Sequence, residues 1–439
     1  MKAKKFLALT ILMLLVTASV FALGREQKNV IHIGASICSE GAYAIVGVPY
    51  GNFYKIFVDY INQAPEYKNI LQGKTLKYTV YDDKGDGAAG KALIERLIYD
   101  DKVDALVGIL GTWNLIAAKD LLETTGIPAV YFGTGSSAQV FEPAVGKQRY
   151  MMGVQPNYNT EGRLMYLRAA TSFGSIRSIG VVHSTGDDGI SFREGIEIQA
   201  ARDTRADKPT VIYQSISSMD AAAISAQIAA VQNCDVIIAA GNQAYFKAIY
   251  SAAYANSFAR PKPVITTYTN AAGSILPPEA VTANAAEIYS ASWVVLNESD
   301  PNSPEAQRRW KDAEEYFKVV DWAIANNRLP ASQKDAYYFN AYSTSSFIAL
   351  KMFLTGLERL YAAGKPFTPE NYLEVMESSR CPVALSGGVD YSGGKRIGLD
   401  SLSFVKYQKP ASNDPAQGFF VEIEPMASIE ELISRFENK

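Results

Sequence analysis

The sequence predicts an α/β fold built from two doubly wound units in tandem. Short β-branched runs alternate with segments in which apolar residues recur at helical spacing. This alternation occurs twice, and no linker rich in Gly, Ser or Pro separates the two series. Because a β-α-β-α order produces parallel strands with helices on both faces, each series should form its own covered sheet. The 439 residues are enough for two or three domains.

The first series extends from residue 30 to residue 131. Strands are expected where β-branched or alternating apolar residues cluster, and helices where apolar residues recur every three or four positions. On this basis the expected strands are 30–34, 75–81, 104–108 and 127–131, and the expected helices are 47–62, 90–99 and 115–125.

The second series begins after a loop near residues 153–156. Its expected strands are 178–183, 211–215, 235–240 and 263–267, and its expected helices are 161–173, 190–201, 221–231 and 245–256. The remainder does not repeat this pattern. It contains two long helical segments, 304–325 and 341–360, and a Gly-rich stretch at 393–396 that predicts a hairpin turn before a strand at 401–407. These elements can pack back on the two units.

The first 24 residues have the pattern of a secretory signal peptide. Three lysines precede an apolar stretch at 6–20, and the small residues Ala22 and Gly24 follow it. A retained membrane anchor is the alternative, but the stretch is shorter than the about 20 residues that a spanning helix needs. We therefore expect an exported protein, periplasmic or secreted, and no lipid anchor because no Cys lies at the cleavage point.

Composition argues against several function classes. The net charge is −3 with no long basic run, so we expect binding neither to nucleic acid nor to anionic lipid. Cys38, Cys234 and Cys381 match no metal motif and are expected to be isolated buried thiols. With His32 and His183 as the only histidines, we expect no metal and no cofactor.

Catalytic motifs are also missing from the sequence. It contains no phosphate-binding loop ending in Gly-Lys-Ser/Thr and no Gly-x-Ser-x-Gly elbow. The run 133–138 starts like a dinucleotide fingerprint but lacks the third Gly and follows the fourth strand. His183 could contact a ligand, although packing or capping explains it as well. Turn formation and helix capping explain Asp82, Asp83 and Asp86 better than calcium binding does. We therefore predict a binding protein; an exported hydrolase is the alternative of another class.

Two loops at strand ends have the composition of a ligand site. In a doubly wound sheet, ligands bind at the carboxyl ends of the strands. Thr112 and Trp113 follow the third strand, and Thr134, Gly135 and Ser136 follow the fourth. Such loops offer backbone N–H groups and hydroxyls to a carboxylate or another anion. Ordinary helix N-capping by Thr112 and Ser136 is the alternative.

The order of several short motifs resembles a known family. These are the type I periplasmic binding proteins of the branched-chain amino-acid (leucine/isoleucine/valine-binding) group, which serve ATP-driven (ABC) importers. The resemblance extends from residue 30 to residue 407. It is carried by Ile33-Gly34, by 39–44 with Gly47, and by Ile61-Asn62, Tyr81-Asp82-Asp83, Val107-Gly108, Gly126-Ile127-Pro128 and 390–394.

The resemblance implies two α/β lobes joined by three chain crossings, with the ligand buried in the cleft between them. We assign 28–153 plus 293–404 to the N-terminal lobe and 154–292 plus 405–439 to the C-terminal lobe. It further implies a monomer that closes on a small solute by a hinge motion and delivers it to a membrane permease. A sensor that presents the solute to a membrane receptor is the alternative with the same fold.

The resemblance also assigns site residues. The ligand carboxylate should lie on Thr112, Thr134, Gly135 and Ser136, and the second lobe should close over it. Matching second-lobe positions are Asp188, Asn242 and Asn270, and we add Tyr43, Trp113 and Gln243 as contacts.

The second lobe departs from the amino-acid-binding pattern. Amino-acid binders commonly have an aromatic residue where Asp188 and Asn242 stand, and an acid for the α-ammonium where Asn270 stands. Either Asp188 supplies this acid, or the solute is not an α-amino acid; an amide, urea-like, hydroxylated or carboxylic solute then fits. Gly85 and Gly111 replace a disulfide that some family members have between the matching loops.

Overall fold

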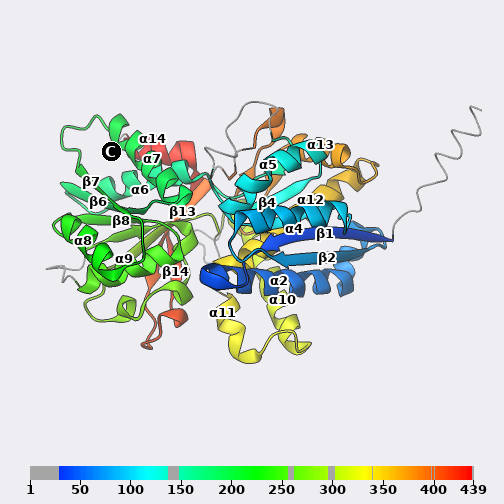
Figure 1. Ribbon diagram of the computed structural model, residues 1–439, viewed down its shortest axis with the longest axis horizontal. Coiled ribbons are helices and arrows are strands. Elements are labelled where there is room, and N and C mark those ends of the chain that lie inside the picture. Colours follow the sequence, from blue (N-terminus) through cyan, green and yellow to red (C-terminus); the bar gives the residue numbers. More distant parts are fainter. Residues whose placement is uncertain are drawn as a thin grey trace, which may run out of the picture.

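The computed structural model describes residues 29–136, 148–255, 262–294, 302–338, 340–396, 398–399 and 401–437. The predicted signal peptide at 1–24 lies outside the described residues. Two α/β lobes lie side by side (Figure 1). This arrangement confirms the predicted fold class of two doubly wound units.

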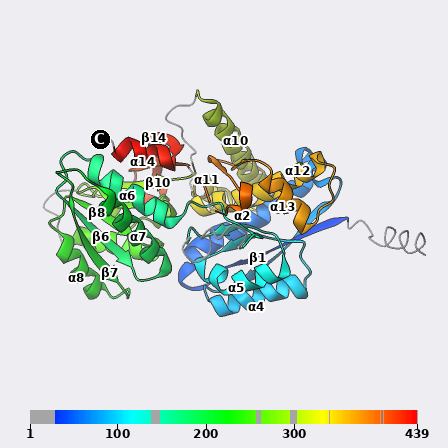
Figure 2. The same ribbon diagram turned by 90° about the horizontal axis from the view of Figure 1, so that it is seen from above.

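The first lobe contains a five-stranded parallel sheet in the order β2-β1-β3-β4-β5. Its strands are β1 (Val30–Ile37), β2 (Thr75–Asp82), β3 (Ala105–Leu110), β4 (Ala129–Gly133) and β5 (Met151–Met152). Helices α2 (Ala44–Gln63) and α12 (Ala341–Ala362) cover one face, and α4 (Gly87–Tyr99) and α5 (Thr112–Thr125) cover the other (Figure 2). Burial on both faces explains why β3 is apolar along its whole length.

The second lobe contains a seven-stranded sheet in the order β14-β13-β10-β9-β8-β6-β7. Five strands are parallel: β6 (Ser178–Ser184), β7 (Thr210–Ile216), β8 (Val236–Ala240), β9 (Val264–Thr266) and β10 (Ile288–Ser292). Helices α6 (Tyr158–Thr171), α7 (Asp187–Arg202) and α14 (Ile429–Glu437) lie on one face, and α8 (Ala221–Val231) and α9 (Gln243–Ala255) on the other. Both sheets therefore reverse strand order next to their first strand, which is where a doubly wound fold places its ligand.

The C-terminal part adds to both lobes. The predicted long helices are present as α10 (Pro304–Ala325) and α12, and shorter helices occur at α3 (Lys68–Leu71), α11 (Lys334–Tyr338) and α13 (Pro369–Glu377). Strands β13 (Ser401–Gln408) and β14 (Phe419–Ser428) extend the second sheet in antiparallel fashion. Because β13 belongs to the second sheet over its whole length, the boundary expected at 404/405 falls inside a strand.

The hairpin turn predicted at 393–396 is wrong. Gly393 and Gly394 have φ of +65° and +80° and form a short 3-10 turn, not a link between two paired strands. The strand before them, β12 (Gly388–Val389), pairs with β11 (Cys381–Pro382) instead. The chain therefore does turn at these glycines, but β13 pairs with β10 and β14.

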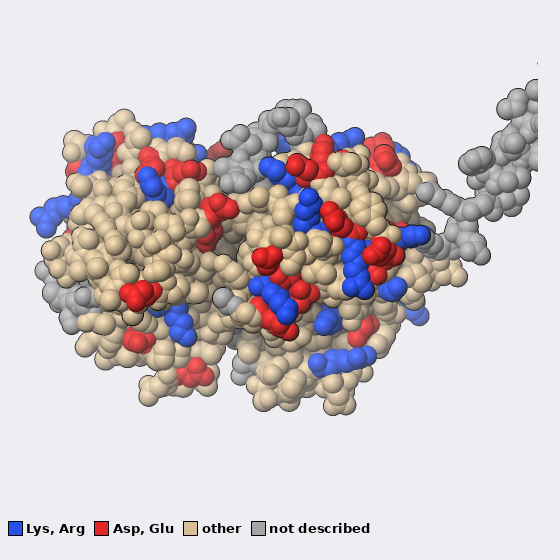
Figure 3. Space-filling view, in the orientation of Figure 1, with Lys and Arg blue, Asp and Glu red and all other residues tan. Residues whose placement is uncertain are grey.

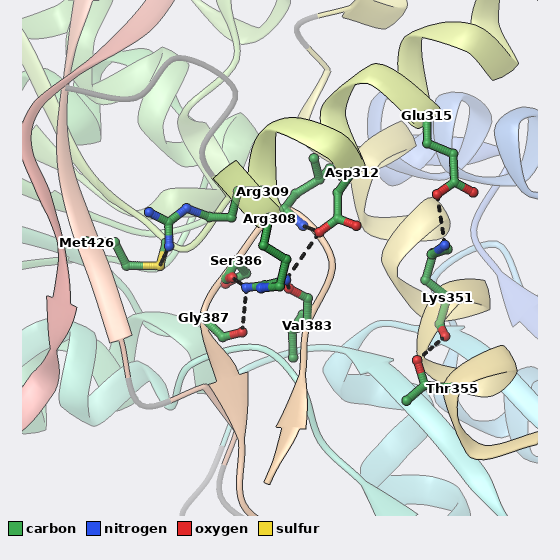
Figure 4. A network of polar contacts seen from close by, with 11 residues as sticks. Arg308, Arg309, Asp312, Glu315, Lys351, Thr355, Val383, Ser386, Gly387 and Met426 are labelled. Carbon is green, nitrogen blue, oxygen red and sulfur yellow. Dashed lines mark hydrogen bonds and ion pairs between the residues drawn. The ribbon is translucent and has the colours of Figure 1, made fainter. Parts of the chain in front are cut away.

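The start of α10 joins several distant segments (Figure 4). The Arg308 guanidinium donates to the backbone carbonyls of Val383, Ser386 and Gly387, and Asp312 accepts from the backbone N–H of Leu385 at 3.0 Å. Arg309 points the other way, toward the Met426 sulfur of β14 at 3.9 Å. One helix end thus holds the turn between β11 and β12 and also contacts the second sheet.

Two of the segments that connect the lobes are held together. The backbone N–H of Leu399 donates to the carbonyl of Val154 at 2.9 Å, and the Tyr391 hydroxyl donates to the carbonyl of Gly153 at 2.7 Å. Gly398 lies so close that a Cβ there would be 1.7 Å from the Gln155 carbonyl oxygen. Only Gly fits at this contact between the crossings.

We expect Gly398→Ala to destabilise the folded protein by about 1–3 kcal/mol, because one crossing segment must move away from the other. Urea denaturation of the variant and the wild type measures this difference. An unchanged unfolding midpoint would show that the two crossings do not touch in the folded protein.

The three cysteines are buried and free, as expected from the sequence. On the face shown in Figure 3, basic and acidic side chains are intermixed over both lobes, and neither sign gathers into a large patch. Among the described residues, no helix combines the length and the apolar character that crossing a membrane requires.

Candidate functional site

A cavity of about 210 Å³ lies between the two lobes. The first lobe contributes residues that follow β1 and β3 and residues at the end of β4, and the second lobe contributes residues that follow β6, β8 and β9. These are the carboxyl ends of parallel strands beside the points where strand order reverses. Of the predicted site residues, the cavity is lined by Tyr43, Thr112, Trp113, Asp188, Asn242 and Gln243. Thr134, Gly135, Ser136 and Asn270 do not line it.

Thr112 is the first residue of α5, at the floor of the cavity. The N-cap is Gly111, which has φ of +102° and provides no side-chain cap, so the capping alternative for Thr112 does not apply. The hydroxyls of Thr112 and Thr134 are 2.6 Å apart, and the Thr134 oxygen also accepts from the backbone N–H of Ser136 at 3.0 Å. When Thr134 donates to Thr112, the Thr112 proton is available to a ligand, as are the first N–H groups of α5.

The loop after β4 lies behind Thr112 and supports it. Thr134 and Ser136 are each 1% exposed. A Cβ on Gly135 would be 2.2 Å from the carbonyl oxygen of Pro156, and the Gly135 carbonyl accepts from the backbone N–H of Tyr158 at 2.9 Å. These residues thus hold the first lobe against the first crossing, and they contact the cavity wall through Thr112 and Tyr158.

Asp83 positions the next part of the wall. This carboxylate is fully buried and accepts from the Trp113 indole at 3.0 Å, the Asn114 amide at 2.7 Å and the Ser36 hydroxyl at 2.8 Å. It also accepts from the backbone N–H of Gly85 at 2.8 Å. The prediction of a simple turn at Asp83 missed this role, because its partners are distant in the sequence. Asp86 does cap a helix, accepting from the backbone N–H of Ala89.

Tyr43 and Trp113 form an aromatic pair, with ring centroids 4.7 Å apart. A Cβ on Gly85 would be 2.8 Å from the Tyr43 ring, and one on Gly111 would be 2.3 Å from the Trp113 ring. The two glycines that match a disulfide in some family members therefore make room for this pair of rings. Packing of aromatic rings fills the space that a covalent bridge would occupy.

Asp188 is the acidic group of the opposite wall. It lies in the first turn of α7, where the helix N-terminus favours a negative charge. Burial raises the pKa of Asp188, whereas hydrogen bonds from the Gly189 backbone, the Ser184 hydroxyl at 3.1 Å and the Asn242 backbone oppose the rise. Gln243 donates to the carbonyl of Thr269 at 3.0 Å and so ties α9 to the loop after β9.

Asn270 is fully buried behind this wall. Its amide donates to the carbonyl of Gly241 at 2.9 Å and to the Thr266 hydroxyl at 2.8 Å. Both bonds require an NH₂ group, so an acid at this position would lose them. The side chain thus joins the loops after β8 and β9 and does not face the cavity.

Tyrosines bridge the lobes across the cavity. The Tyr342 hydroxyl of α12 donates to the carbonyl of Thr269 at 2.6 Å, and the Tyr268 hydroxyl lies 3.2 Å from the Ser345 hydroxyl of α12. Sequence reasoning missed Tyr268, Tyr342 and Ser345. A signal for them existed, because the start of α12 is rich in hydroxyl residues and yet fully buried.

Tyr131 was missed for a different reason. It lies in β4 but has φ of +61°, a left-handed conformation that costs energy for a bulky residue. Its side chain lines the cavity, where the Gln155 amide donates to its hydroxyl at 3.3 Å. A strand pattern alone does not reveal such a conformation.

Glu161 lies behind the tyrosines at the start of α6 and is 2% exposed. It accepts from the backbone N–H of Tyr268 at 2.6 Å. Burial raises the pKa of Glu161 to about 8, and the hydrogen bond from Tyr268 only partly opposes this effect.

Neither histidine lines the cavity. His183 is buried with its Nδ1 2.8 Å from the Ser184 carbonyl oxygen, and the Nε2 of His32 lies 2.9 Å from the Thr79 hydroxyl. Desolvation lowers the pKa of both imidazoles. Within the described ranges, no three His, Cys, Asp or Glu side chains come together in a way that could hold a metal ion.

Comparisons with known proteins agree with this architecture. Solved structures with the same fold include a fatty acid ABC transporter substrate-binding protein from Thermomonospora curvata, at 16% identity and a TM-score of 0.65, covering 93% of this chain and 94% of that one. Another is a branched chain amino acid ABC transporter from Thermus thermophilus with bound valine, at 13% identity and a TM-score of 0.68, covering 93% and 99%.

A third is a solute binding protein of an ABC transporter from Rhodopseudomonas palustris BisB5 in complex with 3,4-dihydroxy benzoic acid, at 12% identity and a TM-score of 0.64, covering 91% and 98%. No curated protein matches this chain. The family model described as periplasmic binding protein matches residues 30–409. The chain therefore belongs to the periplasmic binding protein family, as the resemblance in its sequence predicted.

Proposed function

We propose that this protein captures a small polar solute outside the cytoplasmic membrane and delivers it to the permease of an ABC importer. The observation that carries the proposal is the cavity of about 210 Å³, which residues of both lobes line at the carboxyl ends of their strands. A solute in such a cavity contacts both lobes at once, so its binding free energy favours the closed arrangement.

The described part of the cavity is better suited to binding than to hydrolysis. Neither histidine reaches it, so a serine–histidine pair of the kind that an exported hydrolase uses is not built there. The similar structures named above are described as proteins of ABC transporters, which supports an importer as the partner. A pull-down with membrane extracts separates the importer from a sensory receptor.

Small-angle scattering combined with a thermal-shift screen tests the proposal. The probes are amino acids, amides, polyamines, sugars and carboxylates. A probe at 100 times its dissociation constant should stabilise the protein by about 2.7 kcal/mol and reduce its radius of gyration. If no probe of any class stabilises or compacts the protein, solute capture by cleft closure is contradicted.

Thr112→Ala should weaken solute binding without unfolding the protein. The substitution removes a hydroxyl donor, which costs about 0.5–1.5 kcal/mol for a neutral acceptor and about 1.5–3 kcal/mol for a charged one. Calorimetry with the best probe measures the loss. Thr124→Ala is the matched control, because Thr124 lies at the exposed end of the same helix and donates only to the Asp120 carbonyl. Equal losses in both variants would remove Thr112 from the site.

A further inference from the structure

The cavity has a one-sided charge distribution. Its charged lining consists of Asp187 and Asp188, and no Lys, Arg or His among the described residues lines it. Asp187 is exposed, whereas Asp188 is partly buried in the cavity wall. No Lys or Arg side chain in the described part of the chain forms an ion pair with Asp188. The second-lobe wall therefore carries a carboxylate without a protein counter-charge.

Hydrogen bonds hold this carboxylate in one position. The Ser184 hydroxyl and backbone groups of Gly189 and Asn242 donate to it, and it lies in the first turn of α7. These interactions favour its charged form. A buried charge is costly unless a charge of opposite sign accompanies it. A cationic ligand would supply the partner that the described residues do not provide.

Aromatic rings surround the same cavity. Seven of its lining residues are aromatic: Tyr43, Trp113, Tyr131, Tyr158, Phe192, Tyr268 and Tyr342. Tyr43 and Tyr158 are close enough to Asp188 for its charge to raise the pKa of both phenols, after the larger effect of burial. Each of the two rings is backed by another, Trp113 at 4.7 Å and Phe192 at 4.5 Å between centroids. Ring faces attract cations, and the attraction strengthens when water is excluded.

We infer that the solute carries a positively charged nitrogen, a primary or methylated ammonium, which lies against Asp188 between the rings of Tyr43 and Tyr158. This inference rests on the proposed function and adds the charge of the solute to it. A purely anionic solute would meet Asp188 with no basic side chain of the cavity lining to offset the repulsion. A neutral solute would leave the Asp188 carboxylate in the cavity without a counter-charge.

Comparing probes that carry a positively charged nitrogen with probes that lack one tests the inference. Each L-amino acid is compared with its 2-hydroxy acid, and glycine betaine, choline and putrescine are compared with neutral amides and sugars. We expect the cationic or zwitterionic member of the best pair to bind at least about 100-fold more tightly than its partner without the positively charged nitrogen, by analogy with a broken buried ion pair. Tighter binding of either primary or methylated ammonium supports the inference and identifies the kind of nitrogen.

Asp188→Asn should lower the affinity for the best cationic probe at least about 100-fold. Without ligand, the variant should be as stable as the wild type or more so, because a buried charge is removed. Asp207→Asn is the control, since Asp207 is an exposed acid of the same lobe that does not line the cavity. Should Asp188→Asn fold poorly, Tyr43→Leu keeps an apolar side chain, removes the ring, and should weaken a methylated ammonium about 2–30-fold.

Two results would overturn the inference. One is a neutral or anionic probe that binds as tightly as its cationic counterpart, and the other is a cationic probe whose affinity is unchanged in both Asp188→Asn and Tyr43→Leu. If such a neutral probe still compacts the protein, solute capture stands and only the cation assignment falls. Binding of no probe at all contradicts both.

Discussion

Asp83→Ala should destabilise the protein by at least about 3 kcal/mol and should also weaken solute binding. The substitution leaves the buried donors of Ser36 and Asn114, and the partly buried Trp113 indole, without their acceptor, and each buried unsatisfied donor costs about 1–3 kcal/mol. The three share one network, so their costs do not simply add. Because the Trp113 indole then loses its anchor, its ring no longer has a fixed place beside Tyr43 in the cavity wall.

Urea denaturation measures the first effect, and calorimetry with the best probe measures the second. Asp86→Ala is a close control, since Asp86 is an exposed helix N-cap three positions away and should cost about 1 kcal/mol with no effect on binding. Equal destabilisation in the two variants would show that Asp83 acts only as a turn residue, as its sequence context indicates.

Asp83 also shows where sequence reasoning stops. The β-branched runs predicted the strands because burial on two faces leaves a local pattern of composition. The role of Asp83 depends on partners 30 to 47 residues away, and no local pattern records such contacts. Asp83 follows a strand as predicted, whereas Asp82 is the last residue of that strand, and only the fold brings Ser36, Trp113 and Asn114 to Asp83.

The residues of the candidate site also fall into those that the sequence predicts and those that it does not. Asp188, Asn242 and Thr112 line the cavity because each lies within four residues after the end of a parallel strand, and strand ends can be read from the sequence. Asn270 also follows a strand, yet its side chain turns inward to bond Gly241 and Thr266. Position relative to a strand therefore predicts that a residue is near the cavity, but not the direction of its side chain.

Residues from distant elements are the hardest to predict. Tyr342 and Ser345 reach the cavity from α12, a helix of the first lobe that begins at Ala341, far beyond the last strand of its sheet, which ends at Met152. Ser345, one of the buried hydroxyl residues at the start of α12, faces Tyr268 of the second lobe and donates to the backbone carbonyl of Ala341. Hydroxyl residues on a buried helix thus indicate an interface between lobes. This indication can be used only when the helix is already known to be buried.

Glu161 should make the stability of the protein depend on pH in an unusual direction. Burial raises the pKa of its carboxyl from an ordinary 4.5 to about 8 in the folded state. Between these two values the folded protein binds more protons than the unfolded chain, so the contribution of Glu161 to stability falls as pH rises from about 4.5 to 8. The ionisable side chains of Tyr158 and Tyr268 cannot offset this, because burial raises their pKa values and keeps both phenols neutral.

Glu161→Gln should remove this contribution. Its amide oxygen can still accept from the backbone N–H of Tyr268, and the side chain stays neutral at every pH. At pH 5 the variant and the wild type should unfold at similar urea concentrations, because the wild-type carboxyl is then protonated. At pH 9 the variant should be more stable by a few kcal/mol, since the wild type must keep a carboxylate buried without a cation.

Urea denaturation of both proteins at pH 5, 7 and 9 gives the difference directly, and other titrating groups cancel in the comparison. Glu123→Gln, at an exposed position of α5, should show no such pH-dependent difference from the wild type. A Glu161→Gln variant that is less stable at pH 9 than at pH 5, relative to the wild type, would mean that the carboxylate is charged and stabilising in the folded protein. Glu161 would then act as an ionised acceptor at the start of α6 that holds the Tyr268 loop against the cavity, and its burial would be offset by the helix N-terminus.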